Sequence, residues 1–149
     1  MQAFTWKLLL ATPIDQVYDA LATDRGRAKF WAERTEENNG VVRFYFPNGE
    51  RCDAEIVAAD RPLRFCIRYF DALTDFLLAD VDGKTELTLK VNEAPAEDWL
   101  AAYAGWVSVL MNMKAVLDHG ADLTAAIHDF VDHHGRRRGA IDRAVAAKR

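Results

Sequence analysis

The four histidines of this 149-residue chain are the side chains best suited to hold a metal ion or to transfer a proton near neutral pH. They are His119, His128, His133 and His134, and all of them lie in the C-terminal part of the sequence. The spacing between His128 and His133 does not place the two on one face of a helix, and neither cysteine lies near them. P-loop, dinucleotide-binding and G-x-S-x-G motifs are also missing. We therefore predict no metal site, no cofactor and no catalytic residue.

Three carboxylates are candidates for a general acid or base, because they fall on predicted strands that could border a pocket. They are Glu37, Asp75 and Asp80. A carboxylate acts as a general acid or base near neutral pH only when its surroundings raise its pKa. The simpler interpretation is that all three are solvated charges on strand faces or turns, since no two of them form a convincing pair.

The strongest candidates for function are apolar side chains that the sequence pattern directs into one interior. Aromatic residues make up 11% of the chain, which is a large share for one small domain. Such side chains form either a packed core or the lining of an apolar ligand pocket. The predicted ligand-binding set is Trp31, Phe44, Phe46, Ile56, Phe65, Ile67, Tyr69, Phe76, Leu78, Tyr103, Trp106 and Leu110.

Strands and tight turns must position most of this set. Apolar and polar residues alternate over residues 4–11, which predicts a strand with one buried face. Thr12 then reads as the N-cap of a helix that has Pro13 in its first turn, and a second short helix is expected over about residues 24–32. From residue 33 to residue 91, short alternating segments between turns predict an antiparallel meander.

A long helix over about residues 97–118 is expected to supply the opposite wall. Its apolar stripe runs through Trp99, Tyr103, Trp106, Leu110, Met113 and Leu117 at steps of three and four residues. Leu100, Val107 and Met111 are expected to widen that stripe.

The two cysteines and the overall charge bear on compartment and partners. Cys52 belongs to the apolar set of its strand and Cys66 to the opposite set, so we predict no disulfide. The net charge of −4 argues against nucleic acid as a partner. The apolar run near the start is too short for a secretory signal or a membrane span. We predict a cytoplasmic protein with no membrane partner.

Three segments resemble one known family. They read ATPIDQVYDALATDRGRAKFWAE, DGKTELTL and YAGWVSVLMNMKAVLDHGADL. Together they are similar to the START-like (SRPBCC) superfamily, specifically to bacterial homologues of the activator of the heat-shock-protein-90 ATPase. The resemblance implies an α+β helix-grip fold, in which a curved antiparallel sheet wraps around a long C-terminal helix and two short helices follow the first strand. It spans about residues 3–123, so we expect a START-like domain over residues 1–123 and a helical C-terminal extension over residues 124–149.

The resemblance also implies a class of function. Members of the superfamily bind or carry hydrophobic small molecules, and we expect non-catalytic binding of a hydrophobic or aromatic molecule between the sheet and the long helix. One alternative is a cyclase- or hydrolase-like enzyme that uses an inward carboxylate or Tyr69. The other is a protein-interaction or chaperone-associated module.

The C-terminal extension is where the chain departs from the family. Leu123, Ile127, Phe130 and Val131 are spaced as one face of an amphipathic helix that ends at Gly135. Such a helix could cover the sheet, cap the mouth of a cavity or make the contact of a homodimer.

Overall fold

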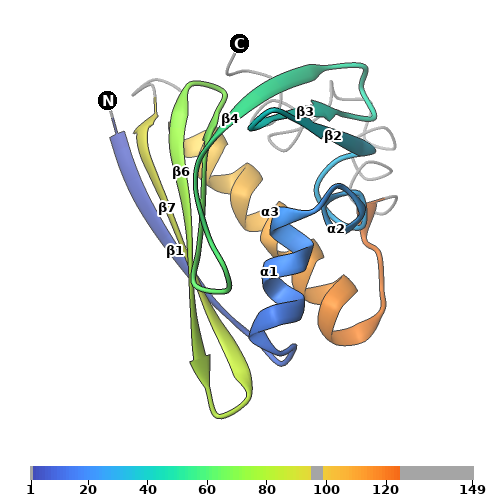
Figure 1. Ribbon diagram of the computed structural model, residues 1–149, viewed down its shortest axis with the longest axis vertical. Helices are drawn as coiled ribbons and strands as arrows, with labels where there is room; N and C mark the ends of the chain where they lie inside the picture. Colours follow the sequence, from blue (N-terminus) through green and yellow to red (C-terminus); the bar gives the residue numbers. More distant parts are fainter. Residues whose placement is uncertain (1, 95–98, 125–149) are drawn as a thin grey trace.

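An antiparallel sheet of seven strands curves around one long helix (Figure 1). The structure is a computed structural model, and it describes residues 2–94 and 99–124. The elements, in chain order, are β1 (Gln2–Leu10), α1 (Ile14–Ala22), α2 (Asp24–Arg27), β2 (Arg34–Asn38), β3 (Val41–Tyr45), β4 (Arg51–Asp60), β5 (Arg64–Tyr69), β6 (Ala72–Val81), β7 (Lys84–Ala94) and α3 (Trp99–His119). The predicted α+β helix-grip fold is confirmed.

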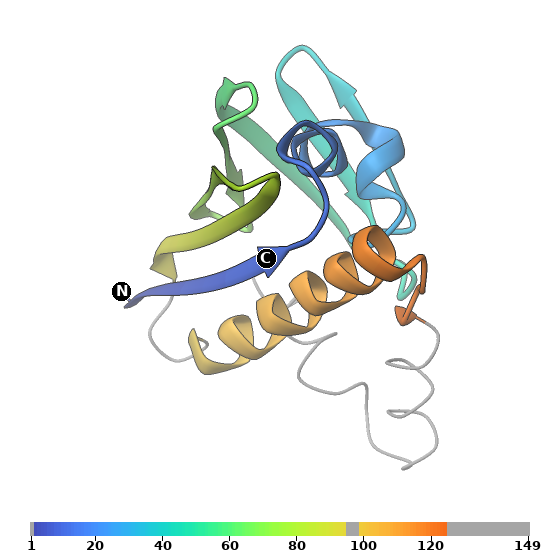
Figure 2. The same cartoon turned by 90° about the horizontal axis from the view of Figure 1, so that it is seen from below.

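The sheet order is β1-β7-β6-β5-β4-β3-β2, so the strands from β2 to β7 form the predicted meander. The first strand, β1, lies at one edge of the sheet and pairs with β7, with Trp6 opposite Leu89 and Leu8 opposite Leu87. Because side chains alternate along each strand, one face of the sheet is apolar and faces α3. Figure 2 shows α3 lying along that face.

Two of the tight turns contain residue types that readily adopt the left-handed backbone conformation. These turns are Asn39-Gly40 and Asp82-Gly83, and all four residues have positive φ. The turn between β5 and β6 is different, because Phe70 and Asp71 adopt φ values of 47° and 65° without a glycine. A bulky residue in this conformation is strained. The ring of Phe70 is buried and stacks on Phe46 at a centroid distance of 6.0 Å, and this packing offsets the strain.

The start of α1 corrects one prediction. Pro13 is the N-cap of this helix and no side chain caps it, so the assignment of Thr12 as the N-cap is wrong. The Thr12 hydroxyl donates instead to the Asp118 carboxylate at 2.7 Å, and the Thr12 backbone N–H donates to the same group at 3.1 Å. Thr12 therefore ties the loop after β1 to the last turn of α3.

The second helix is shorter than predicted, since α2 ends at Arg27. Thr23 caps it by accepting a hydrogen bond from the Gly26 backbone N–H at 3.0 Å. Gly26 lies directly against α1, where an added Cβ would overlap the Asp19 carbonyl oxygen and lie 2.5 Å from the Ala20 Cα. Only glycine lets the two short helices approach this closely.

The long helix buries only part of the stripe expected of it. Trp106, Leu110 and Met113 are buried against the sheet as predicted, whereas Leu100 and Met111 are exposed. The prediction that Leu100 and Met111 widen the buried stripe is wrong. By length and composition alone α3 could cross a membrane, but the core helix of a soluble protein passes the same test.

The substitution Gly26→Ala tests the contact between α1 and α2. We expect the free energy of unfolding to fall by about 2 kcal/mol or more, because backbone atoms of α1 cannot move aside as a flexible side chain would. Urea unfolding measures the effect. Arg25→Ala, at an exposed position of the same helix, is the control and should change the stability by no more than about 0.5 kcal/mol. Equal effects of the two substitutions would contradict the close approach.

Candidate functional site

All the side chains of the predicted ligand-binding set belong to one apolar core between the sheet and α3. Ile56 and Tyr103 are partly buried, and the others are buried. The predicted direction of these side chains is therefore correct, while their role in binding is a separate matter. Their arrangement around one residue, Trp31, defines the candidate site.

Trp31 lies at the centre of this core. Its ring centroid lies 4.8 Å from that of Phe44 and 5.5 Å from those of Tyr69, Phe76 and Trp106. Aromatic rings at these distances are in direct contact. The indole therefore occupies the place between sheet and helix where a ligand was predicted to bind.

Other members of the set lie farther from this centre. Phe46 stacks on Phe44 at 5.9 Å and extends the aromatic group toward Phe70. Tyr103 belongs to a second group near the beginning of α3, where its ring lies 5.0 Å from that of Phe4. The sequence did not single out Phe70, because a turn position gives no periodic signal.

Few polar atoms face the rings around Trp31. The Trp31 Nε1–H donates to the Tyr69 hydroxyl oxygen at 3.3 Å, and the Thr74 hydroxyl donates to the Ala72 carbonyl oxygen at 3.1 Å. Within the described residues the Tyr69 hydroxyl donates no hydrogen bond of its own. Complete burial raises the pKa of Tyr69 well above 10, so its proton stays in place at neutral pH.

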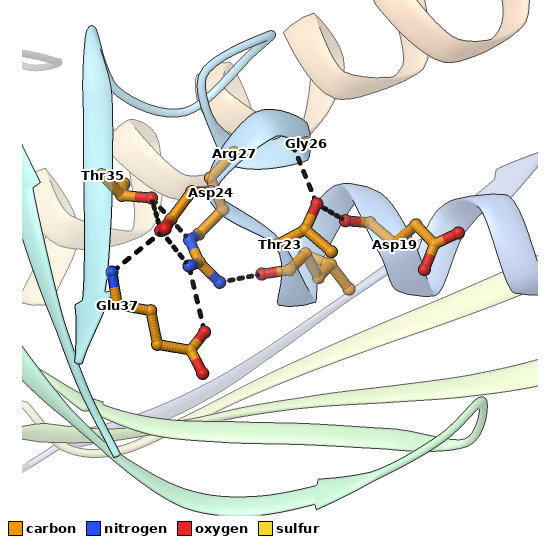
Figure 3. A network of polar contacts seen from close by, with 8 residues as sticks. Asp19, Thr23, Asp24, Gly26, Arg27, Thr35 and Glu37 are labelled. Carbon is orange, nitrogen blue, oxygen red and sulfur yellow. Dashed lines mark hydrogen bonds and ion pairs between the residues drawn. The ribbon is translucent and has the colours of Figure 1, made fainter. Parts of the chain in front are cut away.

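A buried arginine fixes the segment that carries Trp31 (Figure 3). The Arg27 side chain is 0% exposed, and its Nε–H donates to the Thr35 hydroxyl at 3.0 Å. Its Nη1 donates to the Leu21 carbonyl at 3.0 Å, and its Nη2 donates to the Asp24 carboxylate at 2.7 Å. A charged group that is buried away from water is tolerated only when it is paired with an opposite charge and hydrogen-bonded in this way.

Asp24 is the counterion of Arg27 and joins α2 to β2. Its carboxylate accepts from the Thr35 hydroxyl at 2.6 Å and from the Glu37 backbone N–H at 3.1 Å. Burial by itself would raise the pKa of Asp24. The hydrogen bonds from Thr35, Glu37 and Arg27 outweigh that effect and lower the pKa below its usual value.

The backbone on either side of Trp31 is anchored as well. The Trp31 N–H donates to the Arg27 carbonyl at 2.9 Å, and the Glu33 N–H donates to the Tyr45 carbonyl at 2.9 Å. The Phe30 carbonyl accepts from the Asn112 side-chain amide of α3 at 3.2 Å. Trp31 thus sits on a short connection held by α2, β3 and α3.

The three candidate carboxylates do not reach the interior. Asp75 pairs with Arg64 at 2.9 Å on the other face of the sheet, Glu37 lies 3.4 Å from Arg27, and Asp80 accepts from the Gly83 N–H at 3.0 Å. Their simpler interpretation, as charges outside the core, agrees with these contacts.

Within the described residues, the cysteines and His119 form no cluster with other metal-binding or nucleophilic side chains. Both cysteines are buried free thiols, and burial raises the pKa of Cys52 to about 11. His128, His133 and His134 lie outside the described residues. Among residues 2–94 and 99–124, no group of three His, Cys, Asp or Glu side chains could hold a metal ion.

Comparison with known proteins places this geometry in context. A family model described as "Activator of Hsp90 ATPase homolog 1-like protein" matches residues 11–118. Among curated protein sequences, none matches the chain at a significant level.

Several solved structures share the fold. A protein from Staphylococcus saprophyticus aligns with a TM-score of 0.74 at 15% identity, covering 83% of this chain and 96% of that one. An Aha1 dimer from Colwellia psychrerythraea gives 0.71 at 20% identity, covering 80% and 98% of the two chains. A protein from Mesorhizobium loti gives 0.70 at 13% identity, covering 80% and 99%. At these identities the likeness establishes the fold.

The lowered pKa of Asp24 predicts a specific loss of stability in acid. Because the carboxylate is favoured in the folded protein, its stabilising contribution is fully present above the unfolded pKa of about 3.9. That contribution disappears as the pH falls through the lower, folded-state pKa. Asp24→Asn should reduce the stability at pH 7 and flatten the dependence between about pH 5 and pH 2, as measured by urea unfolding at each pH.

Asp82→Asn is the control for this measurement, because Asp82 is exposed in the turn between β6 and β7. It should leave the acid dependence unchanged. An Asp24→Asn variant with the same acid slope as the unsubstituted chain would contradict the role of Asp24.

Proposed function

The chain belongs to the family of activator of Hsp90 ATPase homolog 1-like proteins within the START-like superfamily, and from this premise we propose that it binds a hydrophobic or aromatic small molecule without transforming it. The binding place would be the interior between the sheet and α3, lined by the predicted set described above. The observation that carries the proposal is the position of Trp31, whose single ring fills the centre of that interior.

Binding would exchange one aromatic group for another. If the Trp31 indole swings out, the rings of Phe44, Tyr69, Phe76 and Trp106 border the space that it leaves. Truncating a buried Trp costs about 3–5 kcal/mol, so a ligand must make comparable contacts to hold the open form. A molecule about the size of an indole meets this requirement.

Tyr69 would give the site its polar preference. Once the Trp31 N–H leaves, the Tyr69 hydroxyl is a buried group without a partner, and burying an unpaired hydroxyl costs free energy. A ligand with one N–H or O–H donor near the middle of the site would restore this hydrogen bond. We therefore propose a largely apolar ligand that carries a single hydrogen-bond donor.

The enzymatic alternative receives less support. Tyr69 keeps its proton at neutral pH because burial raises its pKa well above 10, which makes it a poor proton shuttle. Each candidate carboxylate is engaged outside the interior. These observations favour binding over a cyclase- or hydrolase-like reaction.

The substitution Trp31→Ala tests whether the interior accepts an aromatic guest. We expect a loss of about 3–5 kcal/mol in stability, and we expect added indole to raise the melting temperature of this variant by filling the cavity. The control is Trp99→Ala, since Trp99 is only partly buried at the beginning of α3. Equal responses of the two variants to indole would contradict a specific guest site at Trp31.

Native mass spectrometry of the chain purified from the cells that make it tests the function itself. We expect a small bound species, about the size of an indole, that disappears on denaturation. A chain that carries no such species, and that binds no indole or naphthalene in titration, would contradict the proposal.

Self-association is the second candidate function, and the Aha1 dimer from Colwellia psychrerythraea supports it. The homodimer contact predicted on the C-terminal extension would give a mass in solution of twice 16.8 kDa. Light scattering on the full chain over a range of concentrations measures this mass.

The cytoplasm remains the predicted location, and the two free thiols are consistent with it.

A further inference from the structure

The turn between β5 and β6 holds a buried aromatic ring at a position that hairpins normally give to a small residue. Tyr69 pairs with Ala72, so Phe70 and Asp71 are the two central residues of this turn, with φ values of 47° and 65°. A hairpin turn with positive φ at both central positions favours Asn and Gly. The left-handed conformation is unfavourable for a residue with a bulky side chain, so the closed turn is strained.

Two other hairpin turns of the sheet meet the same requirement without a bulky residue. The turn between β2 and β3 and the turn between β6 and β7 each place a glycine at the second central position, Gly40 and Gly83. The residues of both turns are exposed. Backbone strain persists only where the surrounding packing holds it, and strained residues cluster at functional sites. The turn at Phe70 is therefore a candidate for a functional element.

The packing that holds this turn closed belongs to the aromatic interior. The Phe70 ring is 5% exposed, and its centroid lies 6.0 Å from that of Phe46 and 4.7 Å from that of Tyr69. The Tyr69 ring in turn lies 5.5 Å from that of Trp31. The next residue along the chain, Asp71, is exposed. Phe70 thus lies one ring away from the centre of the interior and one residue away from solvent.

A buried thiol lies directly beside this turn. Cys52 of β4 belongs to the same core and pairs with Phe44 of β3. The Phe70 backbone N–H donates a hydrogen bond to the Cys52 sulfur, and Cys52 is 8% exposed. Movement of Phe70 would therefore uncover a group whose exposure can be measured chemically.

We propose that the turn between β5 and β6 is the gate through which a small molecule reaches the interior. In the open form Phe70 and Asp71 leave the left-handed conformation, and the Phe70 ring moves away from Phe46. The relief of strain offsets part of the packing that is lost, so this end of the interior opens more readily than the rest of the core. The inference rests on the proposed binding function, to which it adds the route of entry.

Labelling of Cys52 with dithiodipyridine tests the gate without any ligand. This neutral aromatic disulfide exchanges with an exposed thiol, and the absorbance of the released thiopyridone measures the rate. With Cys66→Ala as the background, Cys52 is the single thiol of the chain. We expect labelling at least tenfold faster than global unfolding permits, with the global free energy taken from urea unfolding of the same variant.

Two substitutions in the turn should move this rate in opposite directions. Asp71→Gly should slow the labelling about fivefold, because glycine removes strain from the closed turn and not from the open one. Phe70→Asn should accelerate it at least tenfold, because the covering ring is lost while asparagine tolerates the left-handed conformation.

Asp82→Gly is the matched control, because Asp82 has a φ of 52° in the turn between β6 and β7. It makes the same backbone change away from the interior and should leave the labelling rate of Cys52 unchanged. Equal slowing by Asp71→Gly and Asp82→Gly would mean that the thiol is reached through global unfolding, which would overturn the gate. An Asp71→Gly variant that reacts at the unsubstituted rate would overturn it as well, because the opening would then occur elsewhere. A chain that labels as expected but carries no bound species in native mass spectrometry would contradict the binding proposal alone.

Discussion

The buried guanidinium of Arg27 is the constraint on which the candidate site depends. A fully buried charge requires partners at every side, and those of Arg27 come from α1, α2 and β2 through Leu21, Asp24 and Thr35. These bonds, together with the close contact between Gly26 and α1, restrict the backbone around Arg27 to one arrangement. Trp31 follows on a connection whose N–H is bonded to the Arg27 carbonyl, so the arginine determines where the indole can lie.

The aromatic interior is the consequence of that placement. The curved sheet and α3 enclose a space that rings from both sides would border, and the indole fills it. The function that we propose therefore depends on how readily one ring moves while its backbone stays anchored. The strained turn at Phe70 belongs to the same arrangement, because its ring extends the stack through Phe46 at the far end of the interior. An anchored connection with one central ring suits a binding site that closes in the absence of ligand.

The sequence was sufficient for most of the fold, because alternation along strands and three-to-four spacing along helices are local signals. It also placed the whole predicted set in one core. The central position of Trp31 and the burial of Arg27 depend on contacts between distant segments, for which periodicity gives no signal. Thr12 shows the same limit, since its local capping pattern was overridden by Asp118 from the end of α3. Leu100 and Met111 were assigned to the buried stripe by hydrophobicity alone, although they lie on the opposite side of the helix.

A crystal structure of the full chain saturated with an aromatic ligand is the most direct test of the central claim, which is that the interior opens by movement of Trp31. The account predicts ligand density among Phe44, Tyr69, Phe76 and Trp106, with the Trp31 ring displaced and the Arg27 bonds unchanged. A ligand bound elsewhere while Trp31 keeps its contacts with all four rings would contradict it.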